Sequence, residues 1–358
     1  MTPALAIYPE IVRRNIAATL ALMGGDQNRW RPHIKTAKLA AIVRMFTGFG
    51  IKQFKCATTL ELRTAILAGA NDVLIAYPLD GANALRAQEI AESEPSVRIS
   101  VLVESCDQIA IWQGKRLSLF VDINPGMDRT GIEQTDISGI LALVRAIQES
   151  GLEFRGLHYY DGHLNTQREL TANAHLGYHQ LLHIIEALQA KGVAVLEVIT
   201  SGTPTICAAL HFTGFRNANL LHRISAGTVV YCDVRSLQQL PAGYAPAAIV
   251  VSRVVSHPHE GIITCDAGHK TISVDVGVPN CVVMDQPEVV PMQPSEEHLP
   301  LRINPAVIPP EIGSFLYLIP CHICPTVNNF DHALFVRSGA IDGVEKVSAR
   351  GRERPLLE

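Results

Sequence analysis

Lys35 is the residue of this sequence whose type and position best fit nucleophilic chemistry. It lies in the segment Arg31–Lys38 (RPHIKTAK), directly after a short run that predicts the end of a first β-strand. A lysine amine at the end of a strand, inside the mouth of a barrel, can attack a carbonyl group and form an imine. The alternative is a solvated surface charge, because most lysines are exposed. The sequence therefore marks Lys35 as a candidate carbonyl-binding nucleophile.

Two segments rich in glycine and hydroxyl side chains could hold a phosphate group. Thr200–Thr205 (TSGTPT) follows one predicted strand, and Ser225–Tyr231 (SAGTVVY) follows the next. Glycine allows close approach of the backbone, and hydroxyl groups donate to phosphate oxygens. Each loop by itself is equally well an ordinary turn. Together with Lys35, the two loops indicate a phosphorylated aldehyde cofactor held as an imine, for which pyridoxal phosphate is the obvious candidate.

A cluster of metal-ligating residue types occurs at Cys321–Cys324 (CHIC). We find no second ligand pair near it for a structural zinc site, and no βαβ context for a redox motif. If the segment is extended, side chains alternate, so His322 and Cys324 share one face and Cys321 points to the other. An imidazole and a thiolate suit zinc, whereas a carboxylate in place of the thiolate would favour manganese or magnesium. We therefore predict a zinc site at His322 and Cys324.

Arg129 and His163 follow the fifth and sixth predicted strands, where their side chains could act on a ligand. Arg129 could orient a cofactor or a substrate carboxylate, or it could form an ion pair with the neighbouring Asp128. The imidazole of His163 could exchange a proton with a bound ligand. Other histidines are assigned to structure: a solvated or interhelical helix face for His175, His179 and His183, and a surface turn for His257 and His259.

Eight apolar, β-branched runs predict the strands that would position these residues. They are Trp30–Ile34, Gln53–Ala57, Val73–Tyr77, Arg98–Val103, Ser118–Ile123, Phe154–Tyr159, Glu197–Ser201 and Arg223–Ala226. Segments with helical spacing lie between them, for example Thr59–Ala68 and Thr135–Glu149. This alternation predicts a parallel sheet, and the strand count matches the (β/α)8 barrel, which binds ligands at the C-terminal ends of its strands. A doubly wound α/β sheet is the alternative.

The pattern changes after Pro241–Pro246 to short, closely spaced strands with glycine and proline between them. Examples are Ala247–Val255 and Gly261–Cys265. We therefore predict a (β/α)8 barrel domain over residues 1–240 and a β-rich domain with the metal site over residues 241–358. The first residues of the chain are expected to pack on the β-rich domain.

Length and composition limit the classes of function. The chain has 358 residues, and its 30 basic and 34 acidic side chains give no excess that would attract nucleic acid. We find no apolar run near the roughly 20 residues that cross a bilayer and no signal-peptide pattern. Eight cysteines without framework spacing fit reduced thiols. We expect a cytoplasmic protein that acts on a small molecule, without nucleic-acid or membrane partners.

Six segments, taken in order, resemble the D-threonine aldolase and D-serine dehydratase family. They are Arg31–Lys38, Lys55–Thr58, Gly126–Gly131, Tyr160–His163, Pro294–His298 and His322–Asn328. That family is similar to alanine racemase in its N-terminal barrel and carries a C-terminal β-domain with a divalent-metal site. The resemblance implies pyridoxal phosphate on Lys35, with Arg129 and Tyr160 near it, His163 as an acid–base group, and a metal on His322 and Cys324. It implies a phosphate site at Ser201, Gly202, Thr203, Gly227, Thr228 and Tyr231, and a homodimer.

The resemblance also implies a lyase that acts on β-hydroxy D-amino acids. The Tyr160–His163 and Pro294–His298 segments look like the aldolase branch, which cleaves the substrate to glycine and an aldehyde, and we predict this type. The pair of His322 and Cys324 is instead similar to the dehydratase branch, which converts D-serine or 3-hydroxy-D-aspartate to a keto acid and ammonia. Two other readings are a non-catalytic pyridoxal phosphate carrier, which lacks a β-domain and metal pair, and a racemase, which needs a second acid–base residue.

Overall fold

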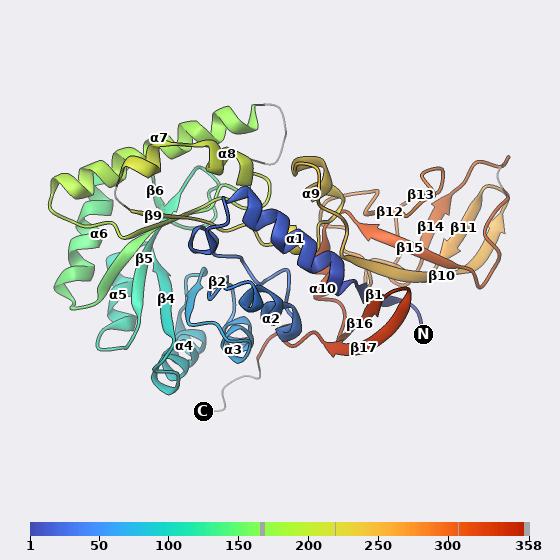
Figure 1. Ribbon diagram of the computed structural model, residues 1–358, viewed down its shortest axis with the longest axis horizontal. Coiled ribbons are helices and arrows are strands. Elements are labelled where there is room, and N and C mark those ends of the chain that lie inside the picture. The colour runs from blue at the N-terminus through green and yellow to red at the C-terminus, as the bar shows by residue number, and fades with distance from the viewer. Residues whose placement is uncertain (165–168, 219, 307, 354–358) are drawn as a thin grey trace. The chain divides into compact units, whose positions relative to one another are not determined.

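The computed structural model describes residues 1–164, 169–218, 220–306 and 308–353, and its contacts divide the chain into two compact units (Figure 1). The β-rich unit comprises Met1–Thr19, Thr36–Met45 and Thr228–Gly351. The barrel unit comprises Leu20–Lys35 and Phe46–Gly227, with the described residues from Arg352 on. The predicted domain division between residues 240 and 241 stays a prediction.

The barrel unit is built on a parallel sheet whose strands follow the chain order. The strands are β2 (Gln53–Cys56), β3 (Asp72–Ile75), β4 (Arg98–Val103), β5 (Ser118–Asn124), β7 (Glu153–Tyr159), β8 (Glu197–Thr200) and β9 (Leu221–Ile224), with the short β6 (Ile132–Glu133) beside β5. They are almost continuous runs of buried residues, as expected where both faces of a parallel sheet are covered. Because a doubly wound sheet departs from chain order, this topology confirms the predicted barrel class.

Helices connect these strands and run along their outer side in Figure 1. They are α3 (Thr59–Leu67), α4 (Gly81–Ser93), α5 (Cys106–Trp112), α6 (Ile137–Glu149), α7 (Leu170–Ala190) and α8 (Ile206–His211), with 3-10 turns η1 (Gln27–Arg29) and η2 (Gly214–Asn217). The predicted helix Thr135–Glu149 starts two residues later, at Ile137, because Asp136 is its N-cap and accepts from the backbone N–H of Gly139 at 2.8 Å. The first helical turn is thus fixed by a side chain outside the helix.

The first predicted strand, Trp30–Ile34, is wrong as a strand. The segment makes only single bridges, from Trp30 to Ile224 of β9 and from His33 to Lys55 of β2. The carbonyl oxygen of Pro32 accepts a hydrogen bond from the N–H of Lys55. Because Pro32 has no N–H group of its own, it cannot donate the next hydrogen bond of a ladder. The segment nevertheless joins β9 to β2, which places Lys35 at the same end as the carboxyl ends of the strands.

A buried ionic network crosses the barrel near the beginning of its strands. Arg31 donates to Asp72 (2.8 Å) and to Glu197 (2.9 Å), and Arg155 contacts the same two carboxylates. Arg223 lies 3.5 Å from Asp72 and 3.6 Å from Glu197. The Arg31 and Arg155 guanidinium groups hold the pKa of Asp72 well below its usual range, against the opposing effect of burial. These ions link five separate segments, so removing one of them would leave uncompensated buried charge.

The β-rich unit contains an antiparallel sheet, with strand β1 inserted in parallel beside β16. Its strands are β1 (Ala4–Ile7), β10 (Ala248–His259), β11 (Ile262–Cys265), β12 (Cys281–Val283), β13 (Val290–Pro291), β14 (Leu299–Arg302), β15 (Phe315–Pro320), β16 (His332–Arg337) and β17 (Ala340–Lys346). Ala4–Ile7 pairs with β10 and β16, so the first residues of the chain belong to this sheet. A core of Val, Ile, Leu and Cys side chains fills the part around β10, β11, β14 and β15.

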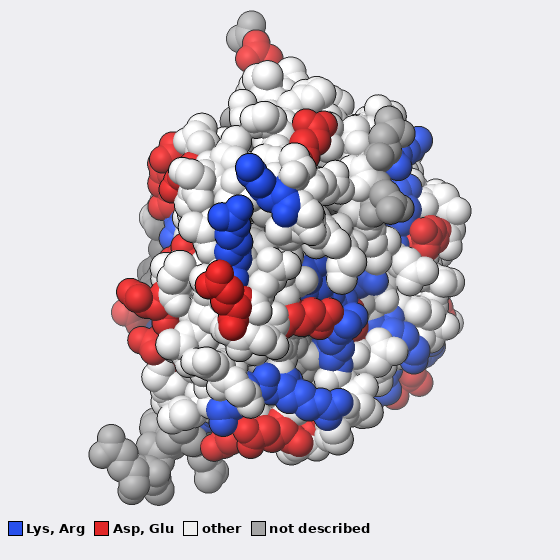
Figure 2. Space-filling view, turned by 90° about the vertical axis from the view of Figure 1, so that its left-hand side faces the viewer, with Lys and Arg blue, Asp and Glu red and all other residues white. Residues whose placement is uncertain are grey.

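The remaining helices belong wholly or mostly to the β-rich unit. They are α1 (Pro9–Leu22), α2 (Ala40–Gly48), α9 (Val234–Gln239) and α10 (Ile323–Val327), with the 3-10 turn η3 (Thr228–Val230). Within the described part of the chain, we find no helix with the length and apolar character needed to span a bilayer. On the face drawn in Figure 2, basic and acidic side chains are interspersed.

Candidate active site

A cavity of about 400 Å³ lies in the barrel unit at the carboxyl ends of the strands. The residues that line it are His33, Lys35, Lys55, Ala57, Ala76, Tyr77, Pro78, Arg129, Thr130, His158 and Tyr160. They come from the segment before Lys35 and from the ends of β2, β3, β5 and β7, which is where barrels of this kind bind their ligands. The structure therefore brings Lys35, Arg129 and Tyr160, which were selected separately in the sequence, into one cavity.

Three cationic side chains surround the ring of Tyr160. The Nζ atoms of Lys35 and Lys55 lie 5.6 Å and 5.4 Å from the ring centroid, and the guanidinium carbon of Arg129 lies 4.9 Å from it. An aromatic face attracts cations at these distances. Among its described lining residues the cavity has no carboxylate, so it is strongly electropositive and suited to an anionic ligand.

Lys55 is a site residue that the sequence reasoning missed. It is 2% exposed, and its Nζ lies 3.2 Å from Nε2 of His158, whose Nδ1 lies 2.7 Å from Oδ1 of Asp122. Burial, and secondly the charge of Lys35, lower the pKa of Lys55 to about 7. A signal was present in the sequence, because lysine is almost never fully buried without a partner, yet Lys55 lies inside a predicted buried strand.

The loop after β8 offers hydroxyl groups that have no protein partner. Within the described residues, the Ser201 Oγ and Thr203 Oγ1 atoms are buried and make no hydrogen bond. Ser201 has a left-handed backbone with φ +65°, which few side chains adopt without support from their surroundings. A Cβ on Gly227, after β9, would lie 2.4 Å from the carbonyl oxygen of His33, so only glycine fits there. Orphaned donors beside closely packed glycine fit a bound phosphate group.

Two other residues of the predicted phosphate site, Thr228 and Tyr231, have contacts within the β-rich unit. Thr228 opens η3 in the β-rich unit, and its Oγ1 lies 3.4 Å from Cys324 Sγ. Tyr231 is fully buried, and its hydroxyl donates to the carbonyl oxygen of Ala37 at 2.9 Å. That hydroxyl is therefore already used within the β-rich unit.

His163 is exposed and follows β7, two residues after the buried Asp161. Asp161 accepts hydrogen bonds from the hydroxyls of Tyr178 (2.6 Å) and Thr205 (2.7 Å). Burial raises the pKa of this carboxyl group, and the hydrogen bonds from Tyr178 and Thr205 oppose the rise. His163 is not part of the described cavity lining, so its proposed role stays a prediction.

The pair of His322 and Cys324 lies in the β-rich unit at the start of α10. The prediction of an extended segment is wrong here, because His322 is the extended N-cap of α10 and Cys324 is in its first turn. The thiol of Cys324 nevertheless lies within hydrogen-bonding reach of His322. Burial opposes the charged imidazolium, but the neighbouring Cys324 and Asp275 raise the pKa of His322 to about 9. The two side chains therefore converge, although by the geometry of a cap and not by strand alternation.

The surroundings of this pair suit a metal ion with open coordination positions. Nδ1 of His322 lies 2.5 Å from Oδ2 of Asp275, which leaves its other ring nitrogen for a ligand. Thr36 Oγ1 lies 3.0 Å from the Cys324 sulfur. Within the described residues we find no group of three His, Cys, Asp or Glu side chains that could hold a metal. An ion at His322 and Cys324 would therefore complete its shell with water or substrate.

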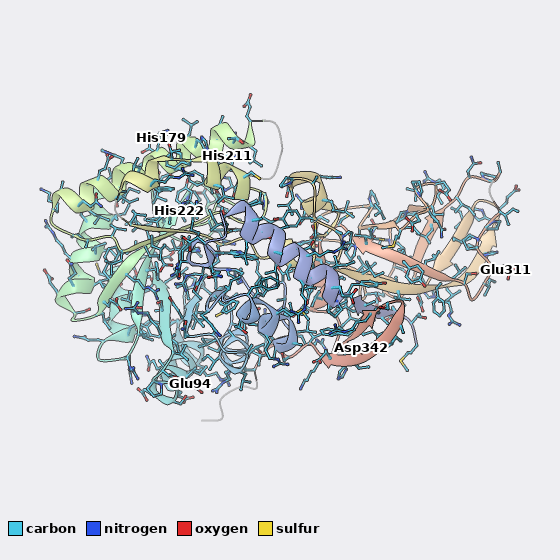
Figure 3. All side chains as sticks on the ribbon, in the orientation of Figure 1. Glu94, His179, His211, His222, Glu311 and Asp342 are labelled. Atoms are coloured by element: carbon cyan, nitrogen blue, oxygen red, sulfur yellow. The ribbon has the colours of Figure 1, made fainter. Side chains whose placement is uncertain are left out.

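Among the other histidines, His175 and His179 make packing contacts on α7, whereas the surface turn predicted for His257 and His259 is wrong, because both residues lie in β10. His175 on α7 donates from Nε2 to the carbonyl oxygen of Ala208 at 2.9 Å, and His179 packs on Phe212 with ring centroids 4.9 Å apart. Figure 3 shows His179 on α7 and His211 at the end of α8. His257, at the exposed end of β10, donates from Nε2 to the carbonyl oxygen of Pro310. These contacts involve helix packing and a strand end.

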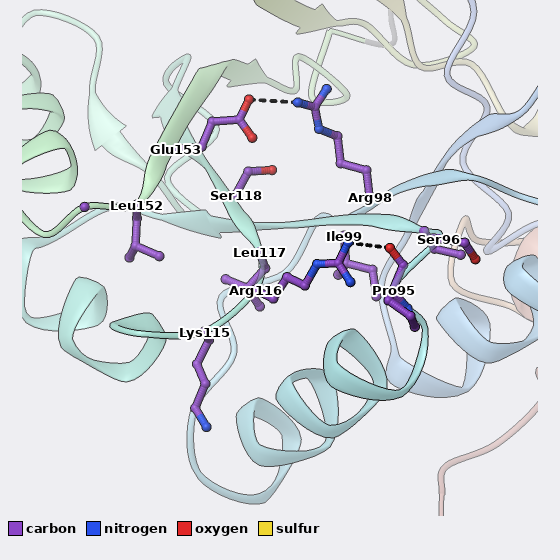
Figure 4. Close-up of a pocket in the computed structure, with 12 residues that line it drawn as sticks. Pro95, Ser96, Arg98, Ile99, Lys115, Arg116, Leu117, Ser118, Leu152 and Glu153 are labelled. Atoms are coloured by element: carbon purple, nitrogen blue, oxygen red, sulfur yellow. Dashed lines mark hydrogen bonds and ion pairs between the residues drawn. The ribbon is translucent and has the colours of Figure 1, made fainter.

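A second cavity of about 470 Å³ lies at the opposite end of the barrel strands (Figure 4). It is lined by residues at the beginning of β4, β5 and β7, where Arg98 and Glu153 form an exposed ion pair at 2.9 Å. Arg116 donates to the carbonyl oxygen of Pro95. Although this cavity is larger, it lies away from the strand ends that carry chemistry in such barrels. We therefore take the cavity with Lys35 as the candidate active site.

Comparison with known proteins gives two family matches along the chain. The family model described as "Alanine racemase, N-terminal domain" matches residues 7–232. The one described as "Putative serine dehydratase domain" matches residues 247–336. The first match includes the cavity with Lys35, and the second includes the pair of His322 and Cys324.

Similar proteins include aldolases and a dehydratase. A D-threonine aldolase from Arthrobacter sp is 24% identical over 366 residues, covering 99% of this chain and 93% of that protein. The crystal structure of a D-threonine aldolase from Filomicrobium marinum has a TM-score of 0.87 and 27% identity, covering 98% of this chain and 96% of that one. D-threo-3-hydroxyaspartate dehydratase from Delftia sp. HT23 has a TM-score of 0.84 and 23% identity, covering 97% of each chain.

Proposed function

We propose that this chain, which belongs to the family with the alanine racemase N-terminal domain, is a pyridoxal phosphate- and divalent-metal-dependent lyase that acts on β-hydroxy D-amino acids. One observation carries the proposal. A lysine in an electropositive cavity lies in the same unit as a loop with two buried hydroxyls that lack partners. Lysine, anion site and barrel together fit a phosphorylated aldehyde cofactor.

The residues of the barrel unit would hold the cofactor as follows. Lys35 would bind the aldehyde carbon covalently, and Ser201 and Thr203 would donate their hydroxyls to the phosphate, with close backbone approach at Gly202 and Gly227. Arg129 and Tyr160, which line the cavity, would contact the cofactor or the substrate carboxylate. When bound, pyridoxal phosphate stabilises the electron pair that is left on the α-carbon when one of its bonds breaks.

The metal would be held by His322 and Cys324, with Asp275 orienting the imidazole. A bound zinc ion supplies Lewis acidity toward the substrate hydroxyl, and manganese or magnesium would be expected with a carboxylate in place of the thiolate. Structures of the Delftia dehydratase exist for a histidine-to-alanine variant and for a cysteine-to-alanine variant two positions further on, the latter in a metal-free form. That spacing is the spacing of His322 and Cys324, which supports this ligand pair.

We favour the D-threonine aldolase type of reaction. In this reading His163 takes the proton of the substrate hydroxyl, and cleavage of the bond between the α- and β-carbons gives glycine and an aldehyde. The similarity to D-threonine aldolases over almost the whole chain supports this choice. The protein would act as a homodimer on a free amino acid.

A dehydratase is the second candidate, and the pairing of a histidine with a cysteine favours it. In that reaction Lys35 takes the proton from the α-carbon, and hydroxide leaves the β-carbon. D-serine or 3-hydroxy-D-aspartate would be converted to a keto acid and ammonia. The two reactions use the same cavity and differ in which bond of the α-carbon breaks.

The test is to supply the cofactor- and zinc-loaded protein with D-threonine, D-serine and 3-hydroxy-D-aspartate, using the L-enantiomers as controls. Glycine and aldehyde are the expected products. Keto acid and ammonia would establish the dehydratase type. Absence of both, in protein whose Lys35 carries the cofactor, would contradict the proposed function and favour a carrier of pyridoxal phosphate.

A further inference from the structure

The side chain of Lys55 is held from behind by a chain of polar groups. Its Nζ lies 3.2 Å from Nε2 of His158, and Nδ1 of that ring lies 2.7 Å from Oδ1 of Asp122. The other oxygen of Asp122 accepts from the hydroxyl of Thr130 at 2.8 Å. Because a carboxylate accepts the proton of Nδ1–H, Nε2 has its lone pair free to accept from the lysine amine. The arrangement fixes one direction of the Lys55 amine and leaves its other N–H positions toward the cavity.

The electrostatic surroundings make this amine able to gain and lose a proton near neutral pH. Burial is the largest effect that lowers its pKa, and the charges of Lys35 and Arg129 lower it further. Asp122 and Asp161 oppose these effects, and the pKa settles at about 7. His158 is itself buried, and burial followed by the charge of Lys55 lowers its pKa, so it stays a neutral acceptor. An acid–base group works best when its pKa lies near the operating pH.

We propose that Lys55 is a second catalytic acid–base residue, which exchanges a proton with the α-carbon of the substrate, and that His158 and Asp122 position its amine. The inference rests on the proposed function. Lys55 lines the same cavity as Lys35, and both amines lie within 6 Å of the centroid of the Tyr160 ring. A substrate whose amine replaced the Lys35 amine on the cofactor would bring its α-carbon close to the position of that amine.

The proton transfer balances without an oxidant or reductant. In the direction of cleavage, the bond between the α- and β-carbons breaks, and its electron pair forms the new bond between the α-carbon and hydrogen. The proton comes from the Lys55 ammonium, whose N–H bond breaks, and the neutral amine then regains a proton from solvent. In the reverse direction the neutral amine removes the same proton from glycine.

The decisive experiment measures exchange of the α-protons of glycine in D2O by NMR, with cofactor-loaded protein. Lys55→Gln keeps a hydrogen-bonding group next to His158 but cannot titrate, and it should slow the exchange roughly 100-fold or more. Lys52→Gln, an exposed lysine immediately before β2, is the matched control and should exchange at the wild-type rate. Cofactor absorbance and borohydride labelling of Lys35 should be the same in all three proteins.

The dependence on pH provides a readout that a purely structural role would not change. Removal of the α-proton by a neutral amine should make the exchange rate rise through about pH 7. Because Asp122 raises the pKa of Lys55, Asp122→Asn should move that rise to lower pH. An unmoved profile in Asp122→Asn would refute the positioning role.

The outcomes separate this inference from the proposed function. Wild-type exchange in a fully loaded Lys55→Gln protein would overturn the inference and leave the lyase proposal standing, with Lys35 as the sole acid–base lysine. Failure of the loaded wild-type protein to exchange the protons of glycine would overturn both. Loss of exchange in Lys55→Gln together with loss of cofactor would overturn the catalytic role, because the lysine would then act in cofactor binding.

Discussion

Replacing Thr203 by valine should have opposite effects on the cofactor-free and the cofactor-loaded protein. The Oγ1 atom of Thr203 is buried without a partner among the described residues, and valine has nearly the same shape without the hydroxyl. An unsatisfied buried hydroxyl is unfavourable by about 1–3 kcal/mol, so Thr203→Val should raise the free energy of unfolding of the cofactor-free protein by up to that amount. The melting temperature of the cofactor-free protein measures this gain.

The same substitution should weaken cofactor binding. A hydrogen bond from a hydroxyl to a phosphate dianion contributes about 1.5–3 kcal/mol, which corresponds to an increase of roughly 10- to 100-fold in the dissociation constant. Titration of the cofactor-free protein with pyridoxal phosphate, followed by absorbance, measures this dissociation constant. The dissociation constant should rise by a similar factor in Ser201→Ala, because the hydroxyl of Ser201 is equally free of partners among the described residues.

Thr205→Val is the matched control in the same loop. The hydroxyl of Thr205 donates to the buried Asp161 at 2.7 Å and accepts from the N–H of Gly202 at 3.3 Å. Its loss should therefore destabilise the cofactor-free protein by about 1–3 kcal/mol, the opposite sign from Thr203→Val. If Thr203→Val leaves the dissociation constant unchanged, the loop does not hold the phosphate and the assignment of the cofactor site is wrong.

Four further predictions concern the lysines and the metal. Borohydride reduction followed by peptide mapping should place the pyridoxyl group on Lys35, and a label on Lys38 or Lys55 would contradict the assignment. Turnover should be abolished by chelation, by His322→Ala and by Cys324→Ala, while cofactor absorbance remains, because the cofactor ligands and the metal ligands belong to different units. Full activity with unchanged metal content in either variant would exclude His322 and Cys324 as the metal ligands. Cys324→Asp should shift metal preference from zinc toward manganese and products from keto acid toward glycine, since a carboxylate favours harder ions. Metal analysis and parallel product assays test this, and wild-type metal preference together with a wild-type product ratio would contradict it. The folded-state pKa of Lys55 (about 7) lies below its unfolded value near 10.4, so the cofactor-free wild-type protein should lose stability as the pH falls between these values. Lys55→Met lacks the amine and should not, so its free energy of unfolding relative to the wild type should grow by up to about 4 kcal/mol from pH 10 to pH 7. Parallel profiles of stability against pH for the two proteins would refute the lowered pKa.

The sequence by itself determined the class of fold and most of the strands. Seven of the eight predicted strands are present because a buried parallel strand is an apolar run with β-branched residues, and this signal is local. The remaining prediction, Trp30–Ile34, has apolar residues only at its two ends, and Pro32 prevents a ladder there. The single bridges to β9 and β2 show its place. Strand pairing depends on hydrogen bonds to distant residues, which composition does not report.

Individual site residues could also be selected from the sequence where chemistry and element ends coincided. Lys35, Arg129 and Tyr160 follow predicted strands, and the barrel rule that ligands bind at the carboxyl ends of strands predicted that they would meet. For Cys324 the predicted backbone was wrong, since the segment turns into α10 directly after His322. The convergence of these two side chains depends on the cap of a helix only five residues long, which has too little sequence to show helical periodicity.

Only the tertiary structure determined the group formed by Lys55, His158 and Asp122. Lys55 is 103 positions from His158, and Asp122 is 36 positions from His158. Each of the three occupies a strand whose sequence is typical of an ordinary buried run. The pairing of Asp122 with His158 follows from the register between β5 and β7, which shifts after Leu119. Without that register the imidazole would face a different residue of β5, because a shift of one position turns every side chain of a strand to the other face. The pKa of the lysine follows in turn from burial and from the charges that the fold places around it, and neither is a property of its neighbours in the sequence.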